Sequence, residues 1–452
     1  MRPKLIVANR GEIACRVIRA AQQLGLATVA VHSEADADAP HVGMADEAVA
    51  IGPSAASESY LQQDKIFAAA RRTGATLLHP GYGFLAENAD FARGCAEQGI
   101  RFVGPSPEVI TAMGDKDRAR RIAVEAGLPV SRGTGRLQGN ESDLLPQGEQ
   151  VGYPLLVKAT AGGGGIGMRR VEHAEGLLDA IKTTRSLAER AFGDGAVYLE
   201  HFVQRARHIE VQVFGFGDGR AVHLFVRDCS VQRRHQKVIE EAMSPALDAA
   251  RSEAIALVAV KLAQACKYEG AGTIEFLYDD ATGEYFFLEM NTRIQVEHPV
   301  TEMITGVDLV SAQIRQALGD PLAIEMAQDR IGATGWAIEA RLYAERPAKN
   351  FIPCPGPLNV MRLPEGPGLR IDTGYRAGMK VTPFYDPMLM KVIAHAETRE
   401  GAIDRLDRAL AELVVEGIET NQSFLRRVLA HSTFQAGHAH TGWLGEVQRE
   451  LI

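Results

Sequence analysis

Polar residues recur at every second position in the segment EMNTRIQVEHPVTE, residues 289–302. An extended strand sends alternate side chains to opposite faces, so such a segment would place its polar groups in one row. The row would contain Glu289, Asn291, Arg293, Gln295 and Glu297. Acid, amide and guanidinium groups in a line are an unusual choice for a solvated strand face. The pattern therefore predicts a strand over 289–297 that handles charged ligands, with His298 on the opposite face in a structural role.

Two carboxylates are predicted to face each other just before this row. The turn signal DDATGE lies between two apolar runs and predicts a hairpin, and a turn about Thr282 would pair Glu275 with Glu289. Directly opposed residues have Cβ atoms about 4.5–5.5 Å apart, where like charges destabilise a pair. A divalent cation between them, most naturally Mg²⁺, would turn this repulsion into binding, and Asn291 could add a ligand or contact phosphate. The alternative is a surface hairpin with solvated carboxylates, which the flanking phenylalanines disfavour.

A glycine run, VKATAGGGGIGMRR, occupies residues 157–170 between two predicted strands. A flexible linker is one interpretation, but linkers are rarely bracketed by buried strands. Glycine permits close backbone approach and positive φ, so consecutive N–H groups can point at phosphate oxygens. Lys158 at the entrance of the run and Lys116 in MGDKDR would add point charges. Together with the carboxylate pair, the run indicates a nucleoside triphosphate and Mg²⁺.

A basic cluster, RDCSVQRRHQKVIEE, interrupts an otherwise acidic chain of net charge −8. Its cations are Arg227, Arg233, Arg234, His235 and Lys237. A nucleic-acid patch is disfavoured because the cluster is short and lacks stacking aromatics, and a solvated loop is the default. The third interpretation is a pocket for a small anion beside the phosphates. Arg293 could then neutralise an anionic substrate, and Glu297 could act as general base on a proton that nearby cations make acidic.

The elements that must position these residues follow a regular order. Five short apolar runs within the first hundred residues alternate with helical patterns, which predicts an open parallel sheet. Strands flank the glycine run, and 208–235 predicts a hairpin that turns at GDG. After residue 334 comes a strand-rich unit closed by amphipathic helices around 400–430. The first strand–helix turn lacks G-x-G-x-x-G, so a dinucleotide site there is a weak prediction.

Composition limits the class of protein. The chain has 452 residues with 46% hydrophobic and 23% charged content, as in soluble globular proteins of two to four domains. No apolar stretch approaches the ~18–20 residues of a membrane span, and the N-terminus lacks a signal-peptide pattern. The five scattered cysteines contain no C-x-x-C pair, which predicts a reducing cytoplasmic location.

Five segments in this order resemble biotin carboxylase, the ATP-grasp component of biotin-dependent carboxylases. They are HPGYGFLAEN, MGDK, KATAGGGGIGM, RDCSVQRRHQKVIEEA and EMNTRIQVEHPVTEMITG. The resemblance continues through NFIPCPG and YDPMLMKVI, so it covers essentially the whole chain.

The resemblance implies an α/β chain of three domains. It implies an N-terminal open parallel-sheet domain over 1–112, an ATP-grasp domain over 113–325 with a mobile glycine-loop lid at about 130–204, and a C-terminal α+β domain over 334–445. It also implies a reaction, in which MgATP and bicarbonate give carboxyphosphate, whose CO₂ carboxylates biotin on a biotin carboxyl carrier protein or domain. Mg²⁺ or Mn²⁺, as two ions, would be the cofactor.

The family's functional residues transfer to matching positions of this chain. The implied metal ligands are Glu275, Glu289 and Asn291. The implied ATP-binding set is Lys116, Lys158, Gly163, Gly164, Gly165, Gly167, Glu200, His208, Gln232 and His235. The implied bicarbonate set is Lys237, Arg293, Gln295 and Val296, with Glu297 as base, while Arg341 would stabilise the biotin enolate and Tyr82 would lie near biotin.

One departure concerns the glycine loop, where Ile166 replaces the lysine or arginine usual in the family. We expect altered ATP affinity or lid closure rather than loss of function. Another acyl-phosphate ligase, such as a carbamoyl-phosphate synthetase-like enzyme, is the alternative enzyme, and a nucleotide-binding regulatory module is the alternative of another class. A carboxyltransferase subunit is an implied partner, homodimerisation is common in the family, and neither a nucleic acid nor a membrane is expected as a partner. The final acceptor, an acyl-CoA or another compound, cannot be read from these residues.

Overall fold

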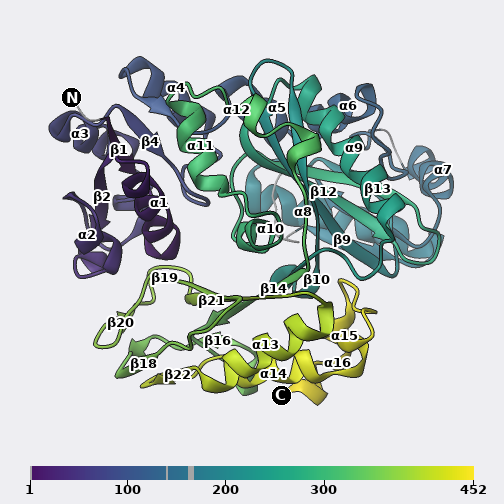
Figure 1. The fold of residues 1–452 in the computed structure, drawn as a ribbon. Helices are drawn as coiled ribbons and strands as arrows, with labels where there is room; N and C mark the ends of the chain where they lie inside the picture. Colours follow the sequence, from purple (N-terminus) through teal and green to yellow (C-terminus); the bar gives the residue numbers. More distant parts are fainter. Residues whose placement is uncertain (1–2, 139–140, 161–166) are drawn as a thin grey trace.

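The computed structural model describes residues 3–138, 141–160 and 167–452, which form N-terminal, central and C-terminal units (Figure 1). The N-terminal unit, purple in Figure 1, contains a five-stranded parallel sheet in the order β3-β2-β1-β4-β5. Its strands are β1 Lys4–Val7, β2 Ala27–Ser33, β3 Glu47–Gly52, β4 Leu77–His79 and β5 Arg101–Phe102. Its helices are α1 Gly11–Gln23, α2 Pro40–Met44, α3 Gln63–Thr73 and α4 Ala89–Glu97. The predicted parallel sheet is confirmed.

One eight-stranded sheet runs through the central and C-terminal units in the order β13-β12-β9-β10-β11-β14-β21-β19. Its strands are β9 Ala206–Phe216, β10 Ala221–Arg233, β11 Gln236–Ala242, β12 Glu269–Asp279, β13 Tyr285–Asn291, β14 Trp336–Tyr343, β19 Leu369–Thr373 and β21 Met388–Ala396. Both predicted hairpins, β9–β10 and β12–β13, are present and antiparallel. The antiparallel pairing of β11 with β14 joins the central to the C-terminal unit, so residues of both meet on one face of the sheet.

Helices cover the central unit and connect it to its neighbours (Figure 1). They are α5 Pro107–Gly114, α6 Lys116–Glu125, α9 Ala249–Ala265, α10 His298–Thr305, α11 Leu309–Ala317 and α12 Leu322–Glu325. Helix α9 packs against β9 and β10, and its buried Ile255 and Leu262 join a core that includes Phe276 of β12. Helix α10 packs against β10, β11, β14 and β21. It therefore lies where the two halves of the large sheet meet.

A smaller unit brackets the glycine run. Strands β7 Met168–Val171, β6 Leu155–Ala159 and β8 Val197–His201 form an antiparallel sheet with helices α7 Glu141–Val151 and α8 Leu177–Phe192. The unit has its own apolar core, which contains Val157 and Leu199. The predicted strands on either side of the glycines are therefore confirmed. Gly163, Gly164, Gly165 and Ile166 lie outside the described residues.

The C-terminal unit places helices beneath the large sheet, yellow in Figure 1. They are α13 Arg399–Glu412, α14 Gln422–Ala430, α15 Ser432–Gln435 and α16 Trp443–Leu451. Short strands complete the unit: β15 Glu345–Arg346, β16 Ile352–Pro353, β17 Gly356–Pro357, β18 Val360–Arg362, β20 Lys380–Val381 and β22 Val414–Glu416. Apolar residues of β14 and β21, among them Leu342 and Val392, pack with Leu406 of α13 in one core.

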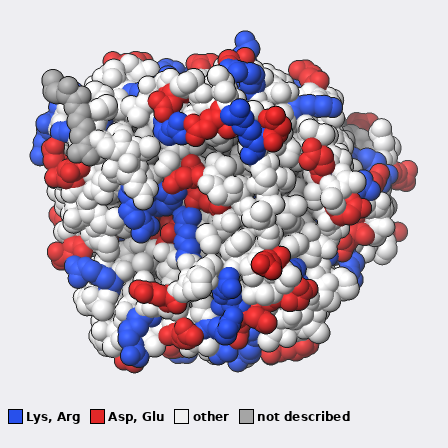
Figure 2. Space-filling model, viewed as in Figure 1, with Lys and Arg blue, Asp and Glu red and all other residues white. Residues whose placement is uncertain are grey.

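Within the described residues, no helix combines the length and apolarity needed to cross a membrane. On the face shown in Figure 2, Lys and Arg side chains are interspersed with Asp and Glu rather than gathered into one broad basic stripe. This distribution agrees with the net charge of −8.

Candidate active site

The predicted carboxylate pair is present on the β12–β13 hairpin. Glu275 is the direct cross-strand partner of Glu289, and an irregularity in the register follows immediately after Glu275. Asn291, the last residue of β13, donates from Nδ2 to Glu275 Oε1 at 3.0 Å. The alternative of a solvated hairpin is wrong for Glu275, which is buried.

The donor set fits a divalent cation. Burial and, less strongly, the charge of Glu275 raise the pKa of Glu289. Keeping Glu289 ionised beside Glu275 therefore costs free energy. Burial alone would also raise the pKa of Glu275, but Lys237 and His208 outweigh it and hold that pKa well below its usual value. A cation between the carboxylates would offset the cost at Glu289, and carboxylate and amide oxygens are ligands that Mg²⁺ and Mn²⁺ accept.

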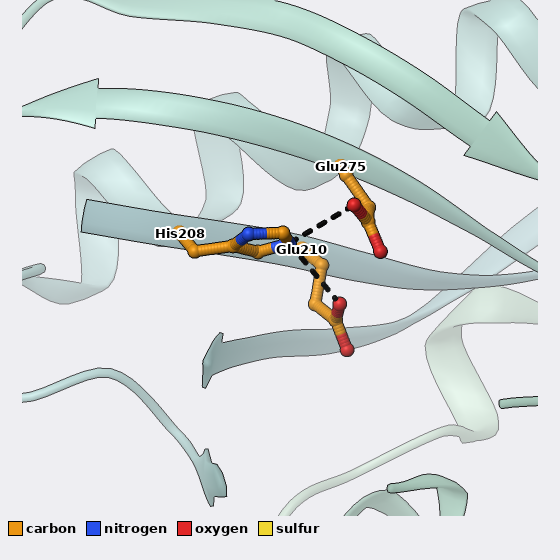
Figure 3. Close-up of side chains that lie close together, drawn as sticks. All are labelled: His208, Glu210 and Glu275. Carbon is orange, nitrogen blue, oxygen red and sulfur yellow. Dashed lines mark ion pairs between the residues drawn. The ribbon is translucent and has the colours of Figure 1, made fainter. Parts of the chain in front are cut away.

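A histidine and a third glutamate extend the pair (Figure 3). His208 Nε2 lies 3.0 Å from Glu275 Oε2 and 3.6 Å from Glu210 Oε2, and all three side chains are buried. Burial alone would lower the pKa of His208, but Glu275 and Glu210 raise it to about 9. The two carboxylates thus favour the protonated imidazole, a form with no lone pair to offer a metal ion. Glu210 was missed from the sequence, although polar residues at alternate positions in HIEVQV were a signal.

Lys237 forms ion pairs with three glutamates of the site. Its Nζ lies 2.6 Å from Glu210 Oε2, 3.1 Å from Glu275 Oε1 and 2.6 Å from Glu297 Oε1. Burial opposes the lysine charge, but the three glutamates outweigh burial and raise the pKa of Lys237 well above its usual value. Burial would raise the pKa of Glu297, yet Lys237 and Arg341 lower it. Glu297 is therefore an ionised carboxylate, able to accept a proton that the same cations acidify.

Arg341 enters the site from the C-terminal unit. Its Nε donates to Glu240 Oε1 at 2.6 Å, and its Nη2 donates to Glu297 Oε2 at 3.0 Å. The carboxylate of Glu297 is thus held by Lys237 on one oxygen and by Arg341 on the other. The pairing of β11 with β14 makes this arrangement possible, because Glu240 and Arg341 belong to neighbouring strands.

The predicted strand over 289–297 is wrong beyond Asn291, where β13 ends. The chain then turns into α10, with Glu297 at the N-cap and Pro299 in the first turn, because proline favours a helix start and cannot donate within a strand. The polar groups nevertheless converge, since Gln295 Nε2 donates to Glu275 Oε1 at 2.8 Å. His298 is buried with Nδ1 2.7 Å from Gln295 O, in agreement with the structural role predicted for it.

Two other members of the row are engaged by distant segments. Arg293 Nε donates to Glu87 Oε2 of the N-terminal unit at 2.9 Å, and its Nη2 donates to Asn291 Oδ1 at 3.1 Å. The carbonyl of Val296 accepts from Lys391 Nζ at 2.7 Å. An anion at Val296 would therefore meet the N–H side of the backbone, because the carbonyl already has a cationic donor.

Of the three interpretations of the basic cluster, the anion pocket does not describe Arg227, Arg233 and Arg234, which are bound elsewhere. Arg227 is completely buried and donates to Glu210, while Arg233 binds Glu345 and Arg234 donates to Asn350. Both faces of β10 are buried around Arg227, and Arg234 lies in the turn after β10. Only His235 and Lys237 of the cluster line the site.

A cavity of about 720 Å³ connects these groups. Its lining contains almost all predicted site residues: Lys116, Lys158, Glu200, His208, Gln232, His235, Lys237, Glu275, Glu289, Asn291, Arg293, Gln295, Val296, Glu297 and Arg341. At its outer end, Lys158 Nζ lies 2.7 Å from Glu200 Oε2, and Ser131 donates to Glu200 Oε1 at 2.9 Å. Gly167, at φ +82°, lies beside the lid strands and is not part of this lining.

Tyr82 lines an adjoining cavity of about 470 Å³, which shares Val296 and Arg341 with the larger one. Its hydroxyl donates to Glu12 in a short hydrogen bond. Of the two residues that the resemblance places near biotin, Arg341 therefore lines both cavities and Tyr82 lines the smaller one.

An ATP-binding unit with a paired-carboxylate site and a buried base, between an N-terminal parallel sheet and a C-terminal domain, defines an enzyme of the ATP-grasp class. Family models match the biotin carboxylase N-terminal domain at residues 1–110, the carbamoyl-phosphate synthase L chain ATP-binding domain at 115–325 and the biotin carboxylase C-terminal domain at 339–446. The chain belongs to the biotin carboxylase family, ATP-dependent ligases that carboxylate biotin with ATP and bicarbonate.

Individual relatives agree. Biotin carboxylase 1 of Bacillus subtilis is 49% identical over 98% of each chain. Rat mitochondrial methylcrotonoyl-CoA carboxylase subunit alpha is 45% identical, over 99% of this chain and 62% of that protein. The biotin carboxylase domain dimer of 2-oxoglutarate carboxylase from Hydrogenobacter thermophilus, solved with MgADP, ADP and bicarbonate, is 42% identical with a TM-score of 0.93, covering 100% and 99% of the two chains. Relatives are thus named as parts of larger carboxylases.

Proposed function

We propose that this chain carboxylates biotin on a separate carrier, through carboxyphosphate, as the first half-reaction of a biotin-dependent carboxylase. The observation that carries the proposal is the single cavity in which a carboxylate pair, Lys237, ionised Glu297 and Arg341 face one another. Such a cavity suits a reaction that brings a triphosphate, a small anion and a neutral acceptor together.

The carboxylate pair is the metal site of the proposal. Glu275 and Glu289 would hold Mg²⁺ or Mn²⁺ as two ions, with Asn291 beside them. When bound, the ions would neutralise charge on the transferring phosphoryl group. Of the chain's own groups, Lys116 and Lys158 would bind the phosphates, and backbone amides of the glycine run would complete the site.

The remaining nucleotide contacts are assigned to the outer part of the cavity. Glu200, in β8, lies in the segment of the chain that would bind adenine, and its carboxylate is held by Lys158 and Ser131. His208, Gln232 and His235 would lie near the nucleotide; Gln232 Nε2 is 3.1 Å from His208 Nδ1. Closure of the lid over this end would exclude water from carboxyphosphate, which is labile. Ile166 lies in the lid loop and would alter ATP affinity or closure.

Bicarbonate is assigned to the inner part of the cavity. Lys237, Arg293, Gln295 and the backbone of Val296 would bind the anion, and Glu297 would accept its proton. The carboxylate of Glu297 is fixed by Lys237 and Arg341 on opposite oxygens, so it is oriented before bicarbonate binds. The bicarbonate oxygen would then attack the terminal phosphorus while the leaving ADP oxygen takes the negative charge.

Arg341 and Tyr82 are assigned to biotin. A guanidinium that bridges Glu240 and Glu297 can stabilise the enolate charge that develops on the ureido oxygen when biotin loses its proton. Tyr82 would line the biotin site on the side of the neighbouring cavity.

The proposal extends to organisation and partners. We place the domain limits at 1–112, 113–325 and 334–445, with the lid at about 130–204. A biotin carboxyl carrier and a carboxyltransferase would be partners, with a homodimer as the assembly, and the acceptor stays open because relatives differ in it. A reducing cytoplasmic location is supported by five cysteines that are all free thiols.

A second candidate is a ligase that passes carboxyphosphate to another acceptor, which the match of 115–325 to a carbamoyl-phosphate synthase domain favours.

The test is ADP release from MgATP and bicarbonate, with and without free biotin, in the wild type and in Glu297→Gln. Biotin-stimulated, bicarbonate-dependent turnover that the variant loses supports the proposal. Turnover indifferent to biotin would instead support the second candidate.

A further inference from the structure

A second pair of opposed glutamates, Glu240 and Glu339, lies next to Arg341, and Glu339 has no role in the proposed function. Glu240 of β11 is the direct cross-strand partner of Glu339 of β14, and both residues are 0% exposed. Glu240 Oε1 accepts from Arg341 Nε at 2.6 Å. Within the described residues, Glu240 Oε2 and both carboxylate oxygens of Glu339 have no hydrogen-bond partner. Buried carboxylate oxygens without donors are rare and call for a physical reason.

The charged groups around Glu339 come from every element packed against it. Glu240 faces it from β11, Arg341 lies two residues along the same strand, and Lys391 of β21 is the cross-strand partner of Arg341. Glu297, at the N-cap of α10, and Tyr82, after β4, also lie within its electrostatic reach. His298 of α10 and Arg370 of β19 lie farther along this face, where His298 meets Glu302 at 4.0 Å.

The nearby cations are already engaged. Arg341 donates to Glu240 and Glu297, and Lys391 Nζ donates to Val296 O while lying 3.2 Å from Glu12 Oε1. Among the described residues, Glu339 thus forms no ion pair, and another carboxylate, Glu240, is directly opposed to it. Two carboxylates in that position cannot both be ionised at low cost.

We propose that Glu240 and Glu339 share one proton, with Glu339 as the neutral acid, and that this positioning pair controls how Arg341 meets biotin. Neutral Glu339 leaves Arg341 between two carboxylates, those of Glu240 and Glu297. Loss of the shared proton would place a third carboxylate next to Arg341 and draw the guanidinium back toward the strands. The inference rests on the assignment of Arg341 to biotin in the proposed function.

The electrostatics of both groups agree with this arrangement. Burial raises the pKa of Glu240 to about 7, against the lowering effect of Arg341. Burial raises the pKa of Glu339 well above its usual value, and the lowering effect of Lys391 does not offset it. The pair therefore retains a proton at a pH where an exposed glutamate has lost it.

The first measurement tests the proton without relying on catalysis. The folded pair binds a proton that the unfolded chain releases near the usual glutamate pKa, so folding stability falls as pH rises through that interval. Glu339→Gln cannot lose a proton, so its melting temperature relative to the wild type should increase steadily between about pH 5 and about pH 8. A difference that is constant with pH would show that the pair holds no extra proton.

The second measurement tests the connection to Arg341. Biotin-dependent turnover of the wild type should fall at alkaline pH, and Glu339→Gln should move that fall by at least about one pH unit upward. Bicarbonate-dependent ATP cleavage without biotin depends on Arg341 only through its hydrogen bond to Glu297, so its pH profile should shift less. Glu240→Gln removes the acceptor of Arg341 Nε, so we expect biotin-dependent kcat/KM to fall at least about tenfold and further than the biotin-independent rate.

A matched control variant and the pattern of outcomes distinguish the shared proton from the positioning of Arg341. Burial also raises the pKa of Glu345 to about 7, but its partner is Arg233, so Glu345→Gln should leave the biotin-dependent pH profile unchanged. An unshifted alkaline limb in both Glu339→Gln and Glu240→Gln would overturn the positioning role even if the proton is found. A wild type without biotin-stimulated turnover would instead reject the proposed function, while the stability measurement would still decide whether the proton is shared.

Discussion

Arg227 offers the sharpest test of how the site is held together, through the change Arg227→Met. The guanidinium is completely buried and makes an ion pair with Glu210, which is equally buried. Its other acceptors are Gln212 Oε1 at 2.6 Å, Thr273 Oγ1 at 3.0 Å, Gln295 Oε1 at 2.9 Å and Thr301 Oγ1 at 3.0 Å. Methionine fills similar space but donates to none of them.

The size of the loss follows from these contacts. Breaking one side of a buried ion pair costs about 3–5 kcal/mol, because the other charge stays buried and unpaired. Lys237 remains 2.6 Å from Glu210 and compensates part of that charge, while the unpaired amide and hydroxyl groups add to the cost. We therefore expect a loss of about 4 kcal/mol in the free energy of unfolding. For a cooperative unit of about 200 residues, such a loss lowers the melting temperature by about 8–16 °C.

The assay is urea or thermal unfolding of the purified variant, combined with initial rates. Arg220→Met is the matched control, because Arg220 lies at the turn of the same β9–β10 hairpin and is exposed, and its guanidinium pairs with the exposed Asp218 and lies 6.0 Å from the centre of the Phe216 ring. The control should leave the melting temperature almost unchanged. Activity of Arg227→Met should fall even well below its melting temperature, because Gln295 and Glu210 lose their positions.

One result would refute the reasoning. If Arg227 belonged to an anion pocket, which is one of the three interpretations of the basic cluster, Arg227→Met would keep the stability of the wild type and raise KM for bicarbonate. Unchanged stability together with that KM effect would show that the buried network does not depend on the guanidinium.

Three further predictions concern charge pairs of the site. Glu289→Gln should stabilise the metal-free chain by about 1 kcal/mol, because it removes the repulsion between this side chain and Glu275. The same change should reduce the rise in melting temperature that MgATP causes, and an undiminished rise would exclude Glu289 as a metal ligand. His208 is protonated in the folded chain up to a pKa of about 9, against 6.5 as its ordinary value, so its contribution is complete below pH 6.5 and lost toward pH 9. His208→Gln should remove up to about 3 kcal/mol of that pH dependence in urea titrations, and an unaltered slope would contradict the charge assignment. Lys158→Met should leave Glu200 buried without its cation and raise KM for ATP at least about tenfold. Adding Glu200→Gln to this variant should restore its stability but not its KM. Recovery of KM in the double variant would show that Lys158 does not bind phosphate.

Local patterns in the sequence were sufficient for much of the site. The pairing of Glu275 with Glu289 follows from a turn signal and two apolar runs, since hairpin register depends on residues near in sequence. The strands around the glycine run follow from local periodicity in the same way. The biotin half of the proposed function, by contrast, came only from the family resemblance, because no spacing relates Arg341 to Glu297.

Only the tertiary structure decided where buried charges meet. Alternation predicts a strand past Asn291 to Glu297, but the chain leaves the sheet because α10 begins at His298, with Pro299 in its first turn. The polar groups then converge in three dimensions instead of along a strand. The sequence favours a solvated position for Arg227, but the residue is completely buried, since burial depends on which strands flank β10. The opposition of Glu240 and Glu339 arises from the pairing of β11 with β14, strands separated by about a hundred residues. Sequence determines which groups are available and how neighbouring strands fold back, whereas the free energy of burying and pairing charges depends on contacts between distant segments, which only the folded chain defines.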